Sequence, residues 1–587
     1  MSLFRRKKTT IEISPDEIFL DAKNVPQFNQ DTFEGRLEKP VSSKVVATVG
    51  VIITLFIATG LVKSFSLQVL HGEEFVQKSE NNRIISTPLF GSRGIMYDRN
   101  GMALIRNVGT TTHIEIAKRE YAPLDGMAPL IGFVSYPKKD KSGRYWQTEY
   151  VGLDGLEKKY NDVLSGVNGK RIVQVDALGE TTDIHVTEEP EDGTNLTLTI
   201  DAELQDASYA VLQQAMQEGG FKGGAAIVID IDTGELLTLV SAPSFPLYTL
   251  NTEEGAKKLI EAQTDDTKPF LNRAISGLYS PGSTVKPFMA LAALQEDVIS
   301  PLKQIESKGF ITVKNPYGGP DTIFRDWKAH GYTDMRAAIA VSSDVYFYTI
   351  GGGYGDQKGL GIQKIDEYFK KFGFAETTGI DLPGESTGLI PTPDWKLKTF
   401  DEEWRLGNTY HTSIGQYGSQ VTPIQLVRSI ASIANGGRLI VPHLVQTITP
   451  RVGKTETKYT VSKEDLQVIR EGMRQTVVSG SSPVLQQVGF SVAAKSGTAE
   501  IGIRKGRVNS WMTGFFPYQN PRYAFVVVLE NGPVDTVFGA GKTSRDILQW
   551  IAQNRPQYAE IRNEDPKPNA TTTEEVETGL EEGVTPL

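Results

Sequence analysis

Residues 279–294 read YSPGSTVKPFMALAAL, and the fold can be inferred outward from this stretch. Pro287 has no backbone N–H and is tolerated only in the first turn of a helix, so a helix must begin close to Ser283. Ser283 and Lys286 are three residues apart and therefore share one face of that helix. The Ser283 hydroxyl is thus expected among free backbone N–H groups, at the positive end of the helix dipole.

This arrangement suits a nucleophilic serine. A hydroxyl attacks poorly until a base takes its proton, and Lys286 can be that base if burial keeps its amine neutral. The free N–H groups can stabilise an alkoxide and an oxyanion. The Ser-x-x-Lys pattern alone is weak, because a second copy occurs at Ser300–Lys303 without the preceding Pro-Gly. Standing alone, it would describe an ordinary helix start.

Two further motifs follow in the sequence. Ser342-Ser343-Asp344 opens SSDVYFY, and Lys495-Ser496-Gly497-Thr498 opens KSGTAE. Each has a decoy, at 79–81 (SEN) and at 141–143 (KSG), so neither is informative in isolation. Their order, spacing and context are informative. A Ser-x-x-Lys at a helix start, then Ser-x-Asn/Asp, then Lys-Ser/Thr-Gly-Thr is the set shared by penicillin-binding proteins and serine β-lactamases.

The chain resembles class B penicillin-binding proteins well beyond these motifs, in collinear order over roughly residues 45–550. Three segments resemble their nucleophile segment and intervening segments: 271–288 (LNRAISGLYSPGSTVKPF), 378–391 (TGIDLPGESTGLIP) and 413–437 (SIGQYGSQVTPIQLVRSIASIANGG). Two segments resemble their non-catalytic pedestal: 82–101 (NRIISTPLFGSRGIMYDRNG) and 152–160 (GLDGLEKKY).

The resemblance implies a role for each matching residue. Ser283 becomes acylated, with Lys286 as its base. Ser342 relays protons toward the leaving amine, and Asp344 holds Lys286 by a hydrogen bond. The backbone N–H groups of Ser283 and Thr498 form the oxyanion hole.

The opposite wall is implied to bind the terminal carboxylate of the substrate, through Lys495 and Thr498 together with Ser496 and Gly497. Two lysines near one site lower each other's pKa, which helps to keep Lys286 neutral, while Lys495 supplies charge for an anionic peptide end. Neither a metal nor a cofactor is implied.

Three departures from the family pattern bear on substrate positioning more than on the chemistry. Asp344 replaces the commoner asparagine, although the elongation-type subfamily often carries Ser-x-Asp. Its carboxylate favours a charged Lys286 and so opposes the lysine–lysine effect. Tyr417 interrupts the usual Gly-Gln-Gly. Asn509-Ser510-Trp511 stands where many members have a histidine before the tryptophan.

The surrounding sequence predicts an α+β fold. Segment 223–243 reads as two strands joined by a hairpin at Asp232-Thr233-Gly234, and 523–531 reads as a buried strand. The resemblance implies a penicillin-binding/β-lactamase-like transpeptidase domain at 201–562, with an antiparallel sheet flanked by helices. It also implies an elongated, mostly-β pedestal (dimerisation) domain at 66–200.

Two local signals mark the pedestal and its boundary. Asn100-Gly101 reads as a tight hairpin turn. Alternating Leu196, Leu198 and Ile200 predict a strand, and Asp201 then caps a helix that begins AELQDASYAV.

An apolar run near the N-terminus predicts a membrane anchor. Val45–Val62 contains no charge and is bounded by Lys44 and Lys63. Eighteen residues at 1.5 Å each span roughly 27 Å, enough to cross a hydrocarbon core. More residues precede this run than precede a cleaved signal peptide. We therefore expect an uncleaved single-pass anchor at 45–65.

Basic residues are slightly more numerous before this span than after it, which favours a cytoplasmic N-terminus. Residues 1–44 are then a cytoplasmic tail, and the catalytic region lies outside the cytoplasm at a bacterial inner membrane. The acidic residues 563–587 are expected to form a solvated tail.

Composition excludes several classes. The chain has 587 residues and a net charge of −10, with no basic run beyond the first ten residues, so nucleic acid is a poor partner. The absence of cysteine excludes disulfides, thiolate nucleophiles and cysteine zinc sites. Asp326 and His330 are spaced i,i+4, but with six histidines and no HExxH we expect no metal site.

The expected reaction is a two-step acyl transfer between peptidoglycan stem peptides, through an acyl-enzyme at Ser283 that β-lactams would also form. The resemblance favours the elongation type over the septal type and implies a multi-pass glycan polymerase as partner. The alternatives are a D,D-carboxypeptidase or β-lactamase, and a non-catalytic scaffold that activates the polymerase.

Overall fold

The computed structural model describes residues 42–81, 84–109, 116–175, 181–315, 318–446, 460–502 and 506–560. The tail predicted at 563–587 lies outside these residues, as does the tail predicted at 1–44 apart from its last three residues. The chain divides into two compact units, Met1–Ile85 with Val173–Asp183, and Ser86–Ile172 with Ile184–Leu587. The architecture is mixed α+β, as predicted.

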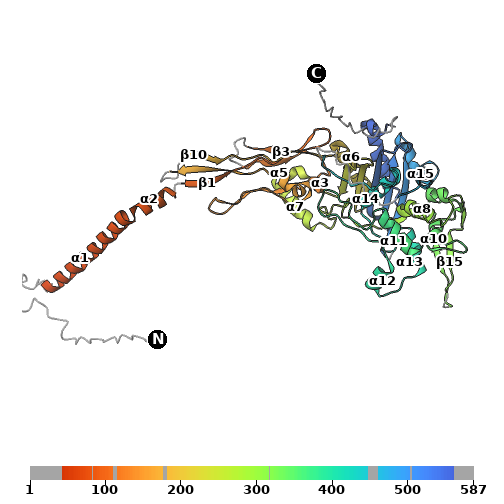
Figure 1. Ribbon diagram of the computed structural model, residues 1–587, viewed down its shortest axis with the longest axis horizontal. Helices are drawn as coiled ribbons and strands as arrows, with labels where there is room; N and C mark the ends of the chain where they lie inside the picture. Colours follow the sequence, from red (N-terminus) through yellow and green to blue (C-terminus); the bar gives the residue numbers. More distant parts are fainter. Residues whose placement is uncertain are drawn as a thin grey trace, which may run out of the picture. The chain divides into compact units, whose positions relative to one another are not determined.

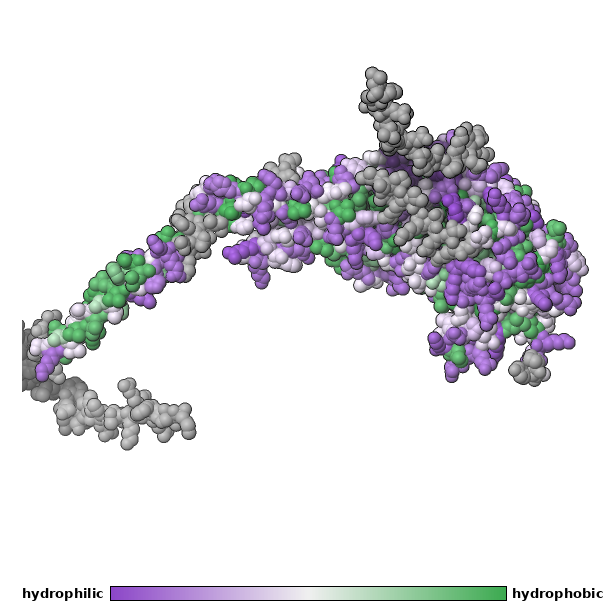
Figure 2. Space-filling view, viewed as in Figure 1, coloured by the Kyte–Doolittle hydropathy of each residue, from purple (hydrophilic) through white to green (hydrophobic). Residues whose placement is uncertain are grey.

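The first unit contains one long apolar helix. Helix α1 (Ser43–Phe65) is capped by the Ser42 side chain and continues through a π-helical turn, Ser66–Leu70. The predicted apolar run 45–62 lies wholly within α1, and none of the residues of α1 is buried. Figure 2 shows hydrophobic side chains along this helix. Together these 28 helical residues are long and apolar enough to cross a membrane. Helix α2 (Gly72–Asn81) follows.

Small sheets and short helices form the pedestal. One sheet has the strand order β11-β2-β3-β4 and another has the order β1-β9-β10. The elements are β1 (Ile84–Leu89), β2 (Met96–Tyr97), β3 (Ala103–Val108), β4 (Lys118–Tyr121), α3 (Ala128–Ile131), β5 (Val134–Ser135), β6 (Lys138–Lys139), β7 (Tyr145–Gln147), β8 (Val151–Gly152), α4 (Gly155–Lys159), α5 (Asn161–Leu164), β9 (Gly169–Val175), β10 (Thr181–Glu188) and β11 (Leu196–Thr197). The predicted turn at Asn100-Gly101 is confirmed: it joins β2 to β3, and Gly101 has φ +85°.

A buried ionic cluster joins the two pedestal segments singled out in the sequence. Glu157 accepts hydrogen bonds from Arg93 Nε at 2.6 Å and from Arg119 Nη2 at 2.7 Å, and all three side chains are fully buried. Arg93 lies in segment 82–101 and Glu157 in segment 152–160. Because removing one partner would leave a buried charge unpaired, these contacts specify how the two segments pack.

The predicted strand at 196–200 is only partly correct. β11 contains only Leu196–Thr197 and pairs in parallel with β2 of the pedestal. Leu198 then makes a single bridge to Val445, so the chain leaves the pedestal sheet after two residues. The predicted cap is confirmed: Asp201 accepts a hydrogen bond from the Leu204 N–H at 3.2 Å and begins α6 (Ala202–Gly219).

A five-stranded antiparallel sheet forms the centre of the C-terminal region, with the order β13-β12-β20-β19-β18. Its strands are β12 (Gly223–Asp230), β13 (Leu236–Ala242), β18 (Ala493–Ile501), β19 (Arg507–Phe516) and β20 (Tyr523–Pro533). The predicted hairpin at 223–243 and the predicted buried strand at 523–531 are both confirmed.

Helices cover both faces of this sheet. Along β12, Ala225, Ile227 and Ile229 belong to a core that also contains side chains of α8 and α14. Ala226 and Val228 belong to a second core with side chains of α6 and α16. Successive strand residues point to opposite faces, so β12 is buried on both and reads as a continuous apolar run.

The remaining elements surround the edge of the sheet at β18. They are η4 (Leu247–Thr249), α7 (Glu253–Thr264), η5 (Gly282–Val285), α8 (Lys286–Gln295), β14 (Ile305–Ser307), β15 (Phe310–Val313), β16 (Thr322–Arg325), β17 (Gly331–Thr333), α9 (Met335–Val341), α10 (Asp344–Gly352), α11 (Gly361–Lys371), α12 (Pro393–Phe400), α13 (Leu406–Ser413), α14 (Pro423–Ala434), α15 (Lys463–Val478), η6 (Pro483–Val488), α16 (Ala540–Asn554) and η7 (Pro556–Tyr558). Helix α10 packs against both α8 and α13 (Figure 1).

Candidate active site

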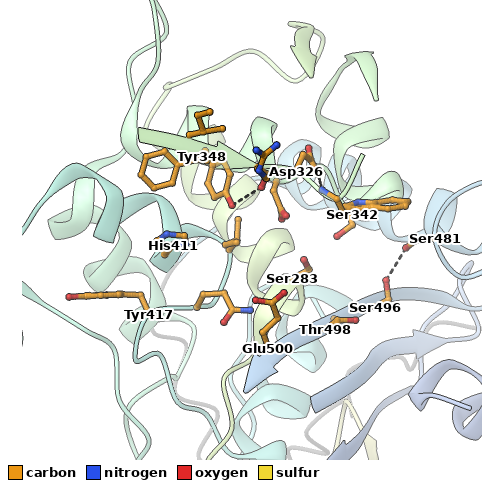
Figure 3. Close-up of a pocket in the computed structure, with 18 of the residues that line it drawn as sticks. Ser283, Asp326, Ser342, Tyr348, His411, Tyr417, Ser481, Ser496, Thr498 and Glu500 are labelled. Atoms are coloured by element: carbon orange, nitrogen blue, oxygen red, sulfur yellow. Dashed lines mark hydrogen bonds between the residues drawn. The ribbon is translucent and has the colours of Figure 1, made fainter. Parts of the chain in front are cut away.

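A cleft of about 1050 Å³ is lined by Ser283 and by three other parts of the chain. These are the turn at 342–344, strand β18 and the segment 411–417. Figure 3 shows Ser283 between Ser342 and Thr498. The cleft therefore collects the three motifs that the sequence places far apart.

Ser283 lies in a single 3₁₀ turn, η5, which runs directly into α8 at Lys286. The prediction that a helix begins close to Ser283 is confirmed. Pro287 occupies the first turn of α8, where its missing N–H costs no helical hydrogen bond. Ser283 is half-buried, while the rest of α8 behind it is buried.

The turn η5 packs tightly against β18. A Cβ atom added at Gly497 would lie 2.7 Å from Thr284 Cγ2 and 3.0 Å from the Pro281 carbonyl oxygen. A side chain at this position would push the strand away from the nucleophile. Glycine at 497 therefore lets the Lys-Ser-Gly-Thr strand approach Ser283 closely.

The Lys286 amine has three acceptors around it. It donates to the Ser342 carbonyl oxygen at 2.7 Å, to Ser342 Oγ at 3.2 Å and to Asp344 Oδ1 at 2.6 Å. Its side chain is fully buried, and its Nζ lies 5.4 Å from the centre of the Phe347 ring. Three polar partners and one ring thus fix the position of this amine next to η5.

Ser342 has an unusual backbone conformation that brings both of its oxygens to the lysines. It ends α9 in the left-handed region, with φ 61° and ψ 41°. Ser343 then caps α10 by accepting a hydrogen bond from the Tyr346 N–H at 3.3 Å. A non-glycine residue in this region is strained, and such strain persists only where surrounding contacts determine the conformation.

Lys495 is buried behind the cleft surface. Its Nζ donates to Ser342 Oγ at 2.9 Å and to the Ser496 carbonyl oxygen at 2.8 Å, and the residue has no exposed area. Burial, together with the nearby charge of Lys286, holds the pKa of the Lys495 amine well below its usual value, although the Asp344 carboxylate acts in the opposite direction. The sequence placed Lys495 on the cleft wall, but it lies beneath that wall.

Hydroxyl groups form the cleft surface on this side. Ser496 and Thr498 line the cleft, as does Ser481, which sequence reasoning missed. Ser481 Oγ lies 2.9 Å from Ser496 Oγ, within hydrogen-bond distance (Figure 3). Ser481 follows α15 and carries no motif, so no pattern in the sequence could have identified it.

Tyr417, the first departure from the family pattern away from the motifs, lines the cleft. Its φ is +56°, a value that glycine adopts more readily. Its ring packs edge-on against Trp404 at 5.7 Å and against Trp395 at 6.3 Å. Tyr417 therefore keeps the backbone of the usual glycine and adds an aromatic wall.

The departure at 509–511 does not reach the cleft surface. Asn509 accepts a hydrogen bond from the Asn531 N–H at 3.0 Å, and Ser510 accepts one from the Ala540 N–H at 3.0 Å. Trp511 is buried and donates from Nε1 to the Ser280 carbonyl oxygen at 3.0 Å. These residues support the nucleophile segment and do not line the cleft.

The second Ser-x-x-Lys lies apart from these groups. Ser300 is exposed, and its Oγ accepts a hydrogen bond from the Leu302 N–H at 3.4 Å. Lys303 Nζ donates to Gln357 Oε1 at 2.7 Å. Neither residue lines the cleft, so the Pro-Gly context correctly distinguished the two copies.

Family models match two parts of the chain. Residues 224–552 match the model described as the penicillin binding protein transpeptidase domain. Residues 112–198 match the model described as the penicillin-binding protein dimerisation domain. Both matches agree with the order of the two regions described above.

Individual relatives and solved structures are also similar. The peptidoglycan D,D-transpeptidase MrdA of Acinetobacter baumannii is 30% identical over 563 residues, covering 79% of this chain and 81% of its own. PBP2 of Pseudomonas aeruginosa is 28% identical with a TM-score of 0.65, covering 82% of this chain and 100% of its own. A chain from a peptidoglycan synthase complex that coordinates polymerization and crosslinking is 26% identical with a TM-score of 0.67, covering 89% and 99%.

Proposed function

Since the chain belongs to the penicillin-binding protein transpeptidases, we propose that Ser283 is its acylated nucleophile and that the adjoining cleft binds the stem peptide. The chain is a serine-type peptidoglycan D,D-transpeptidase of the elongation type. The observation that carries the assignment of Ser283 is the convergence of two lysines on one hydroxyl, Ser342 Oγ, beside η5.

The first step forms an ester at Ser283. Its Oγ attacks the penultimate D-alanine carbonyl of a donor stem peptide, and Lys286 in its neutral form takes the hydroxyl proton. The oxyanion is stabilised by the backbone N–H groups of Ser283 and Thr498. When the peptide bond breaks, the terminal D-alanine leaves as an amine, which receives a proton through the Ser342 hydroxyl.

The two lysines explain how one amine can be neutral. Ser342 Oγ accepts hydrogen bonds from both, so a proton can move between them through this hydroxyl. Two ammonium groups so close together repel each other, which favours a state with one positive charge in total. The carboxylate of Asp344 stabilises the charge when it resides on Lys286.

The terminal carboxylate of the donor would lie against the hydroxyl wall. Ser496 and Thr498 line the cleft and can donate to it, while Lys495 contributes its charge from beneath. In the second step the amine of a neighbouring stem peptide attacks the ester, releasing Ser283. The energy of the cleaved amide is retained in the ester, so no nucleotide is needed.

The test is labelling with a fluorescent penicillin, followed by peptide mapping of the adduct. We expect a stable ester at Ser283 and no labelling of the Ser283→Ala variant. The exposed Ser300 is the internal control, because it has the same Ser-x-x-Lys pattern outside the cleft. An adduct at Ser300, or one that persists in Ser283→Ala, would overturn the assignment.

Product analysis separates cross-linking from hydrolysis. Mass spectrometry of products formed from a donor peptide with an acceptor amine should show the cross-linked dimer. Only the cleaved donor would indicate a D,D-carboxypeptidase, and opened penicillin with rapid turnover would indicate a β-lactamase. A pure scaffold, or a septal enzyme, is distinguished in cells: the scaffold keeps its function in Ser283→Ala, and loss of a septal enzyme blocks division rather than elongation.

The chain is further proposed to work at a bacterial inner membrane beside a multi-pass glycan polymerase. Helix α1 supports a single-pass anchor, and the solved chain from a complex that coordinates polymerization and crosslinking supports the partner. Joint purification of the full chain with a polymerase from membranes tests the pairing. The N-terminus is proposed to be cytoplasmic.

A further inference from the structure

Asp326 is a buried carboxylate at the cleft that the proposed chemistry does not use. It follows β16 directly, and its side chain has no exposed area. A buried charge is costly unless hydrogen bonds or an opposite charge satisfy it. Figure 3 places Asp326 next to Ser342, on the side of the cleft opposite Thr498.

Two of its hydrogen-bond donors come from the turn that carries Ser342 and Asp344. Ser343 Oγ donates to Asp326 Oδ2 at 2.8 Å, and the Val345 N–H donates to the same oxygen at 3.0 Å. Both are charge-assisted hydrogen bonds, which are stronger than bonds between neutral groups. Asp326 therefore holds the start of α10 from behind.

Side chains of this turn alternate between two partners. Ser342 and Asp344 contact Lys286, while Ser343 between them contacts Asp326. The left-handed backbone at Ser342 produces this alternation, and a strained conformation needs surrounding contacts to persist. The bonds from Ser343 and Val345 to Asp326 are such contacts.

Asp326 is itself fixed by contacts away from the turn. Ser307 Oγ on β14 donates to Oδ2 at 3.1 Å, the Trp327 N–H donates to Oδ1 at 2.9 Å, and His330 Nε2 lies 3.4 Å from Oδ1. Burial alone would raise the pKa of Asp326, but hydrogen bonds from the turn and the charge of Lys286 lower it below its usual value. The group therefore stays ionised and accepts all of these donors.

We propose that Asp326 is a positioning residue for this transpeptidase, which holds the turn 342–344 so that Ser342 and Asp344 meet the Lys286 amine. It acts through Ser343 and does not touch the substrate. The proposal rests on the proposed function, because it assumes that Lys286 is the base for Ser283.

The principal test is Asp326→Asn in the full chain, purified in detergent. Asparagine has the same shape, but its amide nitrogen is a donor and would face the donors of the turn. We expect the maximal rate of acylation by a fluorescent penicillin to fall on the order of 10-fold to 100-fold, as when partners that orient functional groups are removed. The half-saturation concentration should stay within about twofold of wild type, because substrate contacts are unchanged.

Two serines provide a matched pair. Ser343→Ala and Ser307→Ala each remove one hydroxyl donor from the same oxygen, Asp326 Oδ2, but only Ser343 belongs to the turn. We expect Ser343→Ala to acylate slowly and Ser307→Ala to acylate near the wild-type rate. Should Asp326→Asn not fold, as judged by thermal unfolding, this pair decides the question alone.

Three results would overturn the proposal. They are a wild-type maximal rate in Asp326→Asn, a Ser307→Ala variant slowed as much as Ser343→Ala, and a change in Asp326→Asn confined to the half-saturation concentration. The last would mean that Asp326 contacts the substrate. Failure of the wild-type chain to form any adduct would instead refute the proposed function, so the two failures are distinguishable.

Discussion

Ser342 Oγ accepts a hydrogen bond from Lys495 Nζ at 2.9 Å, although 153 residues separate them in the chain. The same oxygen accepts one from Lys286 Nζ at 3.2 Å. The two amines share this hydroxyl but differ in their other partners. Lys286 has the Asp344 carboxylate, whereas Lys495 has only the Ser496 carbonyl oxygen in addition. They should therefore fail differently when changed.

Lys286→Ala should lose the rate of acylation. Its amine lies at the start of α8, one turn from Ser283, and is the proposed base. We expect the maximal rate at saturating penicillin to fall on the order of 10²–10⁴-fold, the range for a lost general base. Stopped-flow acylation across a penicillin concentration series measures this rate. Acylation near the wild-type maximal rate would exclude Lys286 as the base.

Lys495→Arg should chiefly weaken apparent affinity. Arginine keeps the positive charge but replaces a compact ammonium by a planar guanidinium in a fully buried position. The hydroxyl wall above it, at Ser496, should then be displaced. In the same stopped-flow series we expect a raised half-saturation concentration, with a smaller loss of maximal rate than in Lys286→Ala. The opposite pattern would exchange the roles proposed for the two lysines.

The lowered pKa of Lys495 predicts a pH dependence of stability. In the unfolded chain a lysine titrates near about 10.4, and in the folded protein Lys495 titrates below its usual value. The folded state binds fewer protons between these two values, so the free energy of unfolding rises with pH there. The unfavourable contribution is complete below the folded pKa and absent above the unfolded pKa.

Thermal unfolding of wild type and Lys495→Met across this window measures the effect. We expect the midpoint of wild type to rise relative to that of the variant as the pH increases toward about 10. The variant removes the titrating group, so other ionisations cancel in the comparison. A difference that is constant with pH, or that falls, would contradict the lowered pKa.

Orientation at the membrane can be tested without background labelling, because the chain has no cysteine. Ser300→Cys places a thiol at an exposed position of the C-terminal region, and Ser2→Cys places one in the predicted cytoplasmic tail. In intact spheroplasts a membrane-impermeant maleimide should label only the first. Labelling of Ser2→Cys before lysis would reverse the proposed orientation.

The apolar helix should remain in the mature protein. Val45–Val62 lies within α1, after a long polar segment that a cleaved signal peptide would not carry. N-terminal sequencing of membrane-purified protein should therefore find no cleavage at this helix. Material that begins after Lys63 would show that the run is removed.

Several elements could be predicted because short-range chemistry determines them. Pro287 restricts where a helix can begin, and α8 begins one residue before it. The hairpin at 223–243 follows from its turn residues, and α6 from its cap at Asp201. The apolar run within α1 needs no tertiary partner to be recognised. Each of these signals lies within a few residues of the structure that it specifies.

Other features were decided by contacts between segments far apart in the chain. Lys495 lies beneath the cleft wall rather than on it, because the edge strand β18 packs directly on η5. Ser481 joins the wall without any motif, and Asp326 holds the turn at Ser343 although the sequence suggested only an unlikely metal pair. Local patterns contain no information on these distances.

The sequence by itself determined the family, the nucleophile segment, the order of the motifs and the apolar anchor, since each depends on residue type and short spacing. Only the tertiary structure decided the left-handed backbone of Ser342 and the meeting of both lysines at its hydroxyl. The physical reason is that a strained conformation and a buried amine are stable only when hydrogen bonds from distant segments satisfy them.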